Sequence, residues 1–172
     1  MEKIIRNTVK DVPDFPKEGI IFKDITPVLK DSSVFSGLID YMYERYRDKN
    51  IDSIVCVESR GFIIGAPLAY RLGVPLVPVR KPGKLPRETY KEEYELEYGK
   101  DGLEIHTDAI ERGDRVVLID DLLATGGTVS AASKLVKKCG AEIEEIFFII
   151  ELDFLKGREK LEGNKIHSIV HY

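Results

Sequence analysis

VVLIDDLLATGGT, the stretch from Val116 to Thr128, runs from a short apolar segment into two acids and then into a loop of small residues. The apolar residues are typical of a buried strand. Ligands of an open parallel sheet bind beyond the carboxyl ends of its strands, so this strand would deliver Asp120 and Asp121 to a ligand site. The stretch predicts an α/β protein whose site lies at the carboxyl ends of parallel strands.

The loop after the acids, residues 124–128 with the sequence ATGGT, has the properties of a phosphate site. Its glycines let backbone N–H groups approach a ligand closely, and the positive N-terminal end of the next helix lies beside them. Acids beside a phosphate do not bind that dianion themselves, so Asp120 and Asp121 are left to bind vicinal sugar hydroxyls, a magnesium ion or both. A ribose 5-phosphate satisfies both halves of this pattern.

The rest of the chain alternates between segments with strand and helix periodicity. Apolar runs predict strands and helically spaced apolar residues predict helices, with Ser32 or Ser33 available as the N-cap of the first helix. We expect strands at residues 53–57, 75–79, 115–119 and 144–150, and helices at residues 33–47, 61–73 and 128–140. Strand and helix in alternation indicate a parallel sheet that is covered on both faces.

Length and composition fit a single globular domain. The chain has 172 residues, of which 43% are hydrophobic and 33% charged, and its net charge is -4. This balance argues against general affinity for nucleic acid or an anionic membrane. Cys56 and Cys139 are far apart and lack metal-ligand spacing, so we expect reduced thiols. Because the sequence lacks a signal peptide and an apolar run of about 20 residues, it predicts a soluble, cytoplasmic protein.

Residues 80–99 interrupt the alternation with a long polar segment. Segments of this kind inside a compact domain are usually functional or disordered. In the second half Tyr94, Leu96 and Tyr98 alternate with glutamates, which predicts a strand that returns the segment to the body. We therefore interpret residues 80–99 as a flap.

Two other phosphate-binding patterns combine a strand with acids or glycines. The second motif of P-loop nucleotidases requires an upstream G-x-x-x-x-G-K-[ST], and the sequence has none. The dinucleotide fingerprint G-x-G-x-x-G is also absent. An ordinary strand–turn–helix connection, whose acids cap the helix, stays open as an alternative.

The stretch from Val116 to Thr128 resembles the phosphoribosyl-pyrophosphate signature of the type I phosphoribosyltransferases, in the form DDLLATGGT that is typical of members acting on adenine. Five further stretches resemble conserved blocks of this family in the same order; they are residues 12–31, 58–62, 80–86, 96–99 and 151–161. The resemblance implies a single domain over residues 1–172, with a central, mostly parallel twisted sheet flanked by helices. It also implies a flexible flap at about residues 80–99 and a small base-binding hood from about residues 1–31 and 151–172.

The implied reaction moves the phosphoribosyl group of 5-phosphoribosyl 1-pyrophosphate to adenine and yields AMP and pyrophosphate. The resemblance further implies Mg2+, held mainly through the substrate, and a homodimer. A different purine base is one alternative, and a regulator that only senses phosphoribosyl pyrophosphate is another. A regulator needs a DNA-reading module, for which a core fold of 172 residues leaves no room.

The family's contacts to ribose and phosphates fall on particular residues of this sequence. Asp120 and Asp121 would bind the ribose 2- and 3-hydroxyls. Ser59 and Arg60 would contact pyrophosphate at a tight turn with a non-proline cis peptide, and Arg60 would act in catalysis by offsetting the charge of this leaving group. The 5-phosphate would be held by Ala124, Thr125, Gly126, Gly127 and Thr128. Across a dimer interface, the pyrophosphate in the partner subunit's site would be contacted by Arg80, Lys81 and Lys84.

The family's contacts to the base fall on residues 20–23, with the sequence IIFK. Phe22 would stack on adenine, and the backbone of Ile21 and Lys23 would bind its edge. Leu152 would form an apolar wall. Phe22 as an ordinary core residue is the alternative.

Glu97 corresponds to the acid that would handle the purine proton, with Tyr98 beside it on the flap. Glu97 as a solvated strand residue is the alternative. Residues 156–161, KGREKL, are interpreted as a solvated helix face rather than a site. The three histidines receive no role, because they lack metal-ligand spacing.

Overall fold

A parallel sheet forms the centre of the molecule in the computed structural model, which describes the backbone of residues 1–96 and 99–172 and the side chains of residues 1–94 and 101–172. Within these residues the main sheet has six strands in the order β10-β9-β7-β3-β4, with the short β8 paired to β9, and every pairing is parallel. The strands are β3 (Ser53–Val57), β4 (Leu76–Val79), β7 (Arg115–Ile119), β8 (Leu122–Leu123), β9 (Glu142–Glu151) and β10 (Ile166–His171).

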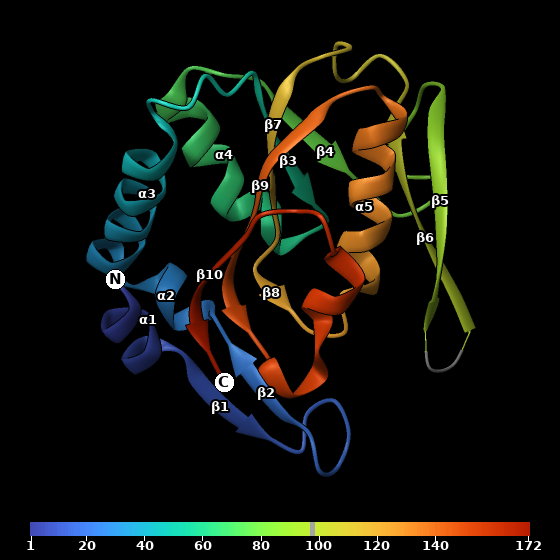
Figure 1. The fold of residues 1–172 in the computed structure, drawn as a ribbon. Coiled ribbons are helices and arrows are strands. Elements are labelled where there is room, and N and C mark those ends of the chain that lie inside the picture. The colour runs from blue at the N-terminus through green and yellow to red at the C-terminus, as the bar shows by residue number, and fades with distance from the viewer. Residues whose placement is uncertain (97–98) are drawn as a thin grey trace.

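Helices cover both faces of this sheet, as the sequence predicts (Figure 1). Alternate residues of β3 show why: Ile54 packs in one buried cluster with residues of α3 and α4, whereas Val55 packs in a second cluster with residues of α5. Strands buried on both faces require this continuous apolar sequence. The helices are α3 (Ser32–Tyr46), α4 (Arg60–Leu72) and α5 (Gly127–Lys138). The predicted fold class is therefore confirmed.

The predicted boundaries are close to the observed ones for most of these elements. Strands β3 and β7 occupy the predicted residues, and the other predicted elements agree within two residues. The N-cap of α3 was predicted wrongly as Ser32 or Ser33. Asp31 is the N-cap, because its carboxylate accepts hydrogen bonds from the backbone N–H groups of Ser33 at 3.0 Å and Val34 at 3.1 Å.

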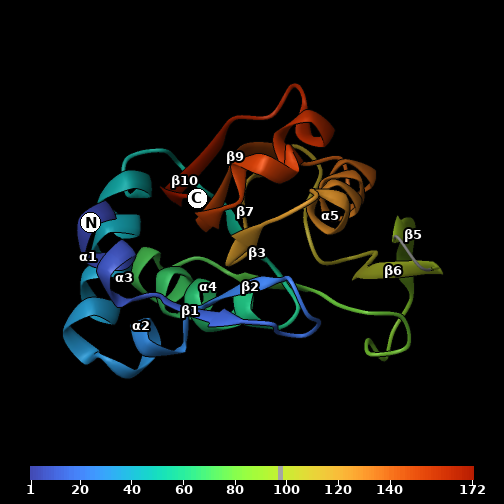
Figure 2. The same cartoon turned by 90° about the horizontal axis from the view of Figure 1, so that it is seen from below.

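The segments expected to form the hood lie at the carboxyl-terminal end of the sheet, and the view from below shows the β1–β2 hairpin on one side and the segment after β9 on the other (Figure 2). Strands β1 and β2 form an antiparallel hairpin, and Lys23 on β2 places its Nζ atom 3.9 Å from the ring centroid of Tyr172. Contacts between residues far apart in sequence therefore join the two segments. Their elements are α1 (Glu2–Thr8), β1 (Lys10–Pro13), β2 (Ile21–Asp24), α2 (Thr26–Lys30) and the 3-10 helices η1 (Asp153–Leu155) and η2 (Gly157–Leu161).

The flap segment contains the predicted strand, paired with one that was not predicted. Strand β5 (Thr89–Leu96) pairs antiparallel with β6 (Gly99–His106), and the hairpin stands on the outer side of α5 (Figure 1). Glu92 holds it there through ion pairs with Lys138 at 2.7 Å and Lys134 at 3.2 Å. Among the described residues, no helix is both long and apolar enough to cross a membrane.

Candidate active site

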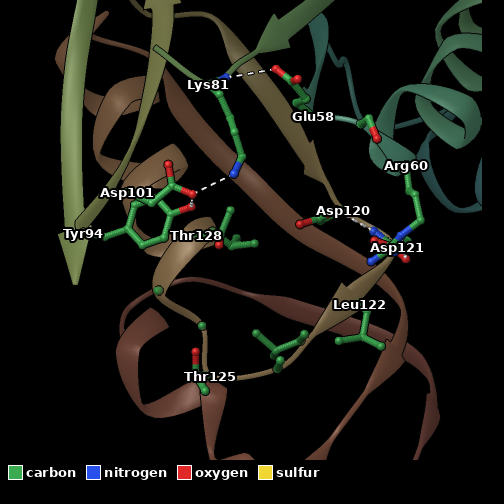
Figure 3. Close-up of a pocket in the computed structure, with 16 residues that line it drawn as sticks. Glu58, Arg60, Lys81, Tyr94, Asp101, Asp120, Asp121, Leu122, Thr125 and Thr128 are labelled. Atoms are coloured by element: carbon green, nitrogen blue, oxygen red, sulfur yellow. Dashed lines mark hydrogen bonds and ion pairs between the residues drawn. The ribbon is translucent and has the colours of Figure 1, made fainter. Parts of the chain in front are cut away.

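A cleft of about 540 Å³ opens at the carboxyl ends of β3 and β7, where the sequence predicts the site (Figure 3). Strands β3 and β7 are neighbours, and their following helices α4 and α5 pack on opposite faces of the sheet. The chain therefore diverges at this point and leaves room for a ligand. The cleft is lined by residues 58–60, by residues 120–129 and by Lys81, Tyr94 and Asp101.

The two acids after β7 have different surroundings. Asp121 is 4% exposed and pairs with Arg60, whose Nε atom lies 2.6 Å from the Asp121 Oδ2 atom. Asp120 accepts a hydrogen bond from the Asp121 backbone N–H at 2.9 Å, and in the described part of the chain it has no ion pair. Burial and the neighbouring Asp121 carboxylate raise the pKa of Asp120 well above its usual value. Of the two, Asp120 is thus the acid without an ion pair among the described residues.

Helix α4 begins unusually close to the end of β7, which places Arg60 in the cleft. A Cβ atom added to Gly61 would lie 2.8 Å from the carbonyl oxygen of Ile119, so only glycine permits this approach. The Glu58–Ser59 peptide bond just before the helix is cis, as the resemblance implies. Ser59 and Arg60 both line the cleft and stand beside the acids.

The loop after the acids also forms the start of α5. Gly126 has a φ angle of 78°, in the left-handed region that favours glycine, and it is the N-cap residue of the helix. The 12-residue helix α5 therefore directs its free N-terminal N–H groups into the cleft. All five residues that the sequence assigns to a 5-phosphate line this part of the cleft.

The flap hairpin supplies a polar wall opposite Arg60. Lys81 places its Nζ atom 2.8 Å from Asp101 Oδ2, and the Tyr94 hydroxyl donates to the same carboxylate at 3.2 Å (Figure 3). The hydrogen bond with Asp101 raises the pKa of Lys81, while burial raises the pKa of Tyr94. The sequence assigned no site role to Tyr94 or Asp101. The alternation in the flap could have marked Tyr94 as inward-facing, but no pattern marks Asp101.

Two of the predicted pyrophosphate residues, Arg80 and Lys84, are not among the residues that line the cleft. Arg80 donates from Nε to Glu58 Oε2 at 3.1 Å and from Nη1 to the backbone oxygen of Lys84 at 3.2 Å. Although burial opposes the change, hydrogen bonds from the Lys81 N–H and from Arg80 lower the pKa of Glu58. Arg80 therefore supports the turn at Glu58 within its own chain. The predicted contact across a dimer interface concerns a second chain and stays a prediction.

The β1–β2 hairpin approaches the cleft through Phe22. The guanidinium carbon of Arg60 lies 5.7 Å from the Phe22 ring centroid, and Phe15 packs edge-on against Phe22 with centroids 5.2 Å apart. Phe22 is half-buried and belongs to neither buried cluster of the described residues, so its alternative role as a core residue is wrong. Its neighbour Ile21 is 57% exposed. An apolar face thus stands next to the acid pair.

The remaining predicted residues fall at the margin of the site or outside it. Leu152 is half-buried against the first core cluster, and Lys23 forms an ion pair with Asp11 at 2.6 Å. Glu97 and Tyr98 lie outside the described residues.

A group of three side chains elsewhere has the spacing of a metal site. Glu151, Asp153 and His171 place their ligand atoms within 4.8 Å of one another. Both Glu151 oxygens, however, are occupied by Arg158 and one also by Ser168. The geometry is that of an ion-pair network, and no role as a metal site follows.

The family model of the phosphoribosyl transferase domain matches residues 26–167 of this chain. The chain belongs to the phosphoribosyltransferase family. The ordinary strand–turn–helix connection is therefore the wrong interpretation of residues 116–128. In this phosphoribosyltransferase domain, the acid pair, the loop and the turn at Arg60 enclose one cleft.

Within the family, several adenine phosphoribosyltransferases are similar to this chain over nearly its whole length. That of Geotalea uraniireducens is 56% identical over 168 residues, which cover 98% of both chains. The crystal structure of adenine phosphoribosyltransferase from Thermoanaerobacter pseudethanolicus is 54% identical, covers 100% of both chains and has a TM-score of 0.95. The Saccharomyces cerevisiae enzyme, in complex with an imino-altritol bisphosphate and adenine, is 44% identical, with 98% and 97% of the chains covered and a TM-score of 0.93.

Proposed function

We propose that this phosphoribosyltransferase transfers the phosphoribosyl group of 5-phosphoribosyl 1-pyrophosphate to adenine and releases AMP and pyrophosphate. The observation that carries the proposal is a single cleft lined by an acid pair, the start of a helix and an arginine that pairs with one of the acids. These groups match a sugar, its 5-phosphate and an anionic leaving group. The relatives named adenine phosphoribosyltransferase support adenine as the base.

The transferred ribose gains oxocarbenium character while pyrophosphate departs. Asp120 and Asp121 bind the sugar hydroxyls and hold the ribose in place. Arg60, kept in the cleft by its 2.6 Å contact with Asp121, offsets the charge on the departing pyrophosphate together with Ser59. The pyrophosphate of the partner subunit's site receives further positive charge from Arg80, Lys81 and Lys84. Residues 124–128 hold the 5-phosphate at the other end, so the reacting carbon is fixed between two anion sites.

Adenine lies on the side of the cleft that Phe22 approaches. Phe22 stacks on the base, the backbone of Ile21 and Lys23 binds its edge, and Leu152 closes the apolar wall. Glu97, with Tyr98 beside it, handles the proton of the purine as the new bond forms. The guanidinium carbon of Arg60 lies 5.7 Å from the Phe22 ring centroid, which supports neighbouring sites for the base and the pyrophosphate.

The side chains of the cleft fit a magnesium ion held mainly through substrate. In the described part of the chain, Glu58, Asp101 and Asp121 each pair with a basic side chain, whereas Asp120 has no ion pair. Oxygen donors suit Mg2+, and Asp120 is the lining acid whose charge is not yet offset. When bound with the diphosphate, magnesium supplies positive charge for the leaving group.

The proposed functional unit is a homodimer in the cytoplasm. Ile63 and Tyr70 stand seven residues apart on α4 and are 46% and 88% exposed, and Leu76 on the edge strand β4 is 37% exposed. Exposed apolar side chains on neighbouring elements favour a protein interface, and the basic residues 80–84 continue from β4. Both cysteines are free thiols, which suits a reducing compartment.

Sedimentation at assay concentration tests the dimer. The wild-type protein should sediment as at least a dimer, and Tyr70→Glu should shift it toward a monomer. A fully active wild-type monomer would contradict this part of the proposal.

An assay with each purine base tests the reaction. Purified protein with Mg2+ and phosphoribosyl pyrophosphate should convert adenine to AMP, followed by absorbance. Turnover of hypoxanthine, guanine or xanthine in place of adenine would move the assignment to another base. Binding of phosphoribosyl pyrophosphate without turnover of any base would favour the regulator.

Glu97→Gln tests the catalytic acid. If Glu97 handles the purine proton, kcat should fall by about 100-fold or more, with little change in the KM for phosphoribosyl pyrophosphate. Glu88→Gln, an exposed substitution just before β5, is the matched control and should be silent. A silent Glu97→Gln would assign the flap a role in closure alone.

A further inference from the structure

The segment KGREKL, residues 156–161, is solvated as its sequence predicts at Lys156 and at residues 158–160, but two of its positions are not. Gly157 and Leu161 are buried, and η2 packs beside the start of α5 (Figure 1). The residues between these two positions are polar, so the sequence pattern does not predict that Gly157 and Leu161 are buried. The segment therefore lies directly behind the loop assigned to the 5-phosphate.

Backbone touches backbone where the segment meets this loop. A Cβ atom added to Gly126 would overlap the carbonyl oxygen of Gly157 and lie 3.1 Å from its carbonyl carbon. In the reverse direction, a Cβ atom added to Gly157 would overlap the carbonyl oxygen of Ala124 and lie 2.9 Å from Leu123 Cδ1. No side chain fits between the two segments at either glycine. The loop cannot move away from the cleft at this point unless Gly157 moves as well.

An ion pair keeps Gly157 in its place. Arg158 donates from Nε to Glu151 Oε1 at 2.6 Å and from Nη2 to Glu151 Oε2 at 2.8 Å, the geometry of a two-pronged pair. The Glu151 side chain is 4% exposed and also accepts a hydrogen bond from the Ser168 hydroxyl at 2.5 Å. Because Glu151 ends the central strand β9, Arg158 connects the segment to the rigid sheet.

The same strand end also holds the other side of the loop. Leu123 of β8 pairs with Glu151, and its carbonyl oxygen accepts a hydrogen bond from the Leu152 N–H at 2.9 Å. Residues 151–158 therefore contact both the entry to the loop, at Leu123, and its bend, at Gly126.

We propose that Gly157 is a positioning residue for the 5-phosphate of the substrate, held in register by the Arg158–Glu151 pair. Loop N–H groups bind a phosphate only while they converge on it, and misplacement by about 1 Å is enough to lower activity strongly. Gly157 sets that position from behind without touching the ligand. The inference rests on the proposed function, which makes a phosphoribosyl compound the ligand of the loop.

Calorimetry with AMP and with adenine tests the proposal on Gly157→Ala. The added methyl group would push the loop into the cleft, so AMP should bind at least about tenfold more weakly while adenine binding changes less than about twofold. In turnover, the KM for phosphoribosyl pyrophosphate should rise more than the KM for adenine. Gly37→Ala is the matched control, because an added Cβ there meets only the end of the Met1 side chain, at 3.4 Å.

Arg158 variants keep the test valid if Gly157→Ala does not fold. Arg158→Gln should weaken AMP binding selectively, and Arg158→Lys should restore part of it. Equal losses for AMP and adenine, or unchanged AMP binding in the folded variants, would overturn the proposal. If the wild-type protein binds neither AMP nor phosphoribosyl pyrophosphate, the proposed function fails instead, so the two failures are distinguishable.

Discussion

The side of the cleft proposed to bind ribose and phosphate (the phosphate side, residues 58–60 and 120–128) and the side proposed to bind adenine (the base side, the β1–β2 hairpin) are built in different ways. The phosphate side consists of strand ends and helix starts in close backbone contact, with Asp121 only 4% exposed. The base side rests on the β1–β2 hairpin, which forms its own two-stranded sheet and leaves Phe15, Ile20 and Ile21 between 45% and 57% exposed. The phosphate side is therefore arranged without a ligand, whereas a base bound as proposed would bury exposed apolar surface on the base side.

The largest expected effect comes from removing the charges of the phosphate side. Asp120→Asn with Asp121→Asn should weaken binding of AMP and phosphoribosyl pyrophosphate by about 100-fold or more, because each charge-assisted hydrogen bond contributes about 1.5–3 kcal/mol. Adenine binding should stay nearly unchanged, since the pair is assigned only to ribose. Calorimetry with all three ligands measures the split, with the exposed Asp48→Asn as control. An equal loss for free adenine would remove the distinction between the two sides.

Phe22→Ala makes the complementary change on the base side. Loss of an aromatic stacking partner costs about 1–3 kcal/mol, so adenine should bind roughly 5- to 150-fold more weakly. Phosphoribosyl pyrophosphate should bind with less than about threefold change, because Phe22 reaches that site only through its 5.7 Å approach to Arg60. Comparable losses for both ligands, measured by calorimetry, would mean that the two sides act as one unit.

Asp120→Asn alone should make the ligand-free protein more stable at neutral pH. The pKa of Asp120 is raised, so its contribution to stability is present below the unfolded value near 3.9 and is lost as pH rises through the folded value. Removing the charge should raise the free energy of unfolding by about 0.5–2 kcal/mol at pH 7.5, with a smaller gain at pH 4.5. Urea unfolding at both pH values measures this. A less stable variant at pH 7.5 would show that the uncompensated acid carries no cost.

The smallest expected effect belongs to the neighbour of Phe22. Phe15 touches Phe22 edge-on at 5.2 Å, and such contacts contribute about 0.5–1.5 kcal/mol. Phe15→Ala should therefore weaken adenine binding about 2- to 10-fold. AMP binding should also weaken, because its base would contact the same residues, whereas its phosphate contacts should not change. Titration with ribose 5-phosphate, which lacks the base, is the control and should be unchanged. A larger effect than that of Phe22→Ala would reassign the stacking residue.

The central sheet could be predicted from sequence because its strands are continuous apolar runs. Residues 53–57 and 116–119 are all buried and all apolar or small, as expected of strands that are covered on both faces, and only Arg115 at the start of β7 is exposed. Strand β10 could not be predicted in this way, because His167 and Ser168 interrupt its apolar pattern. In the structure the His167 ring stacks on Tyr41 with centroids 5.9 Å apart, and its Nε2 atom shares a hydrogen bond with the Tyr41 hydroxyl at 2.8 Å, so these contacts half-bury a polar residue.

The site was predictable where its residues are contiguous and unpredictable where they meet across the chain. Residues 120–128 follow one strand, so their shared position follows from the strand itself. The pairing of Arg60 with Asp121, the contact of Lys81 with Asp101 and the support of Gly126 by Gly157 join residues that are at least 20 positions apart. No local pattern encodes such pairs, because each depends on how α4, the flap and η2 pack against the sheet.

The close backbone approach at Gly61 limits how new specificities can arise in this scaffold. A side chain at this position would collide with Ile119 at the end of β7, so the route to a different leaving group by single substitutions is closed there. The exposed residues of the β1–β2 hairpin face no such barrier, and Ile21 can be exchanged without disturbing the buried clusters of the described residues. Laboratory evolution from this protein should accordingly yield variants for new bases sooner than variants for phosphoribosyl donors with a different leaving group.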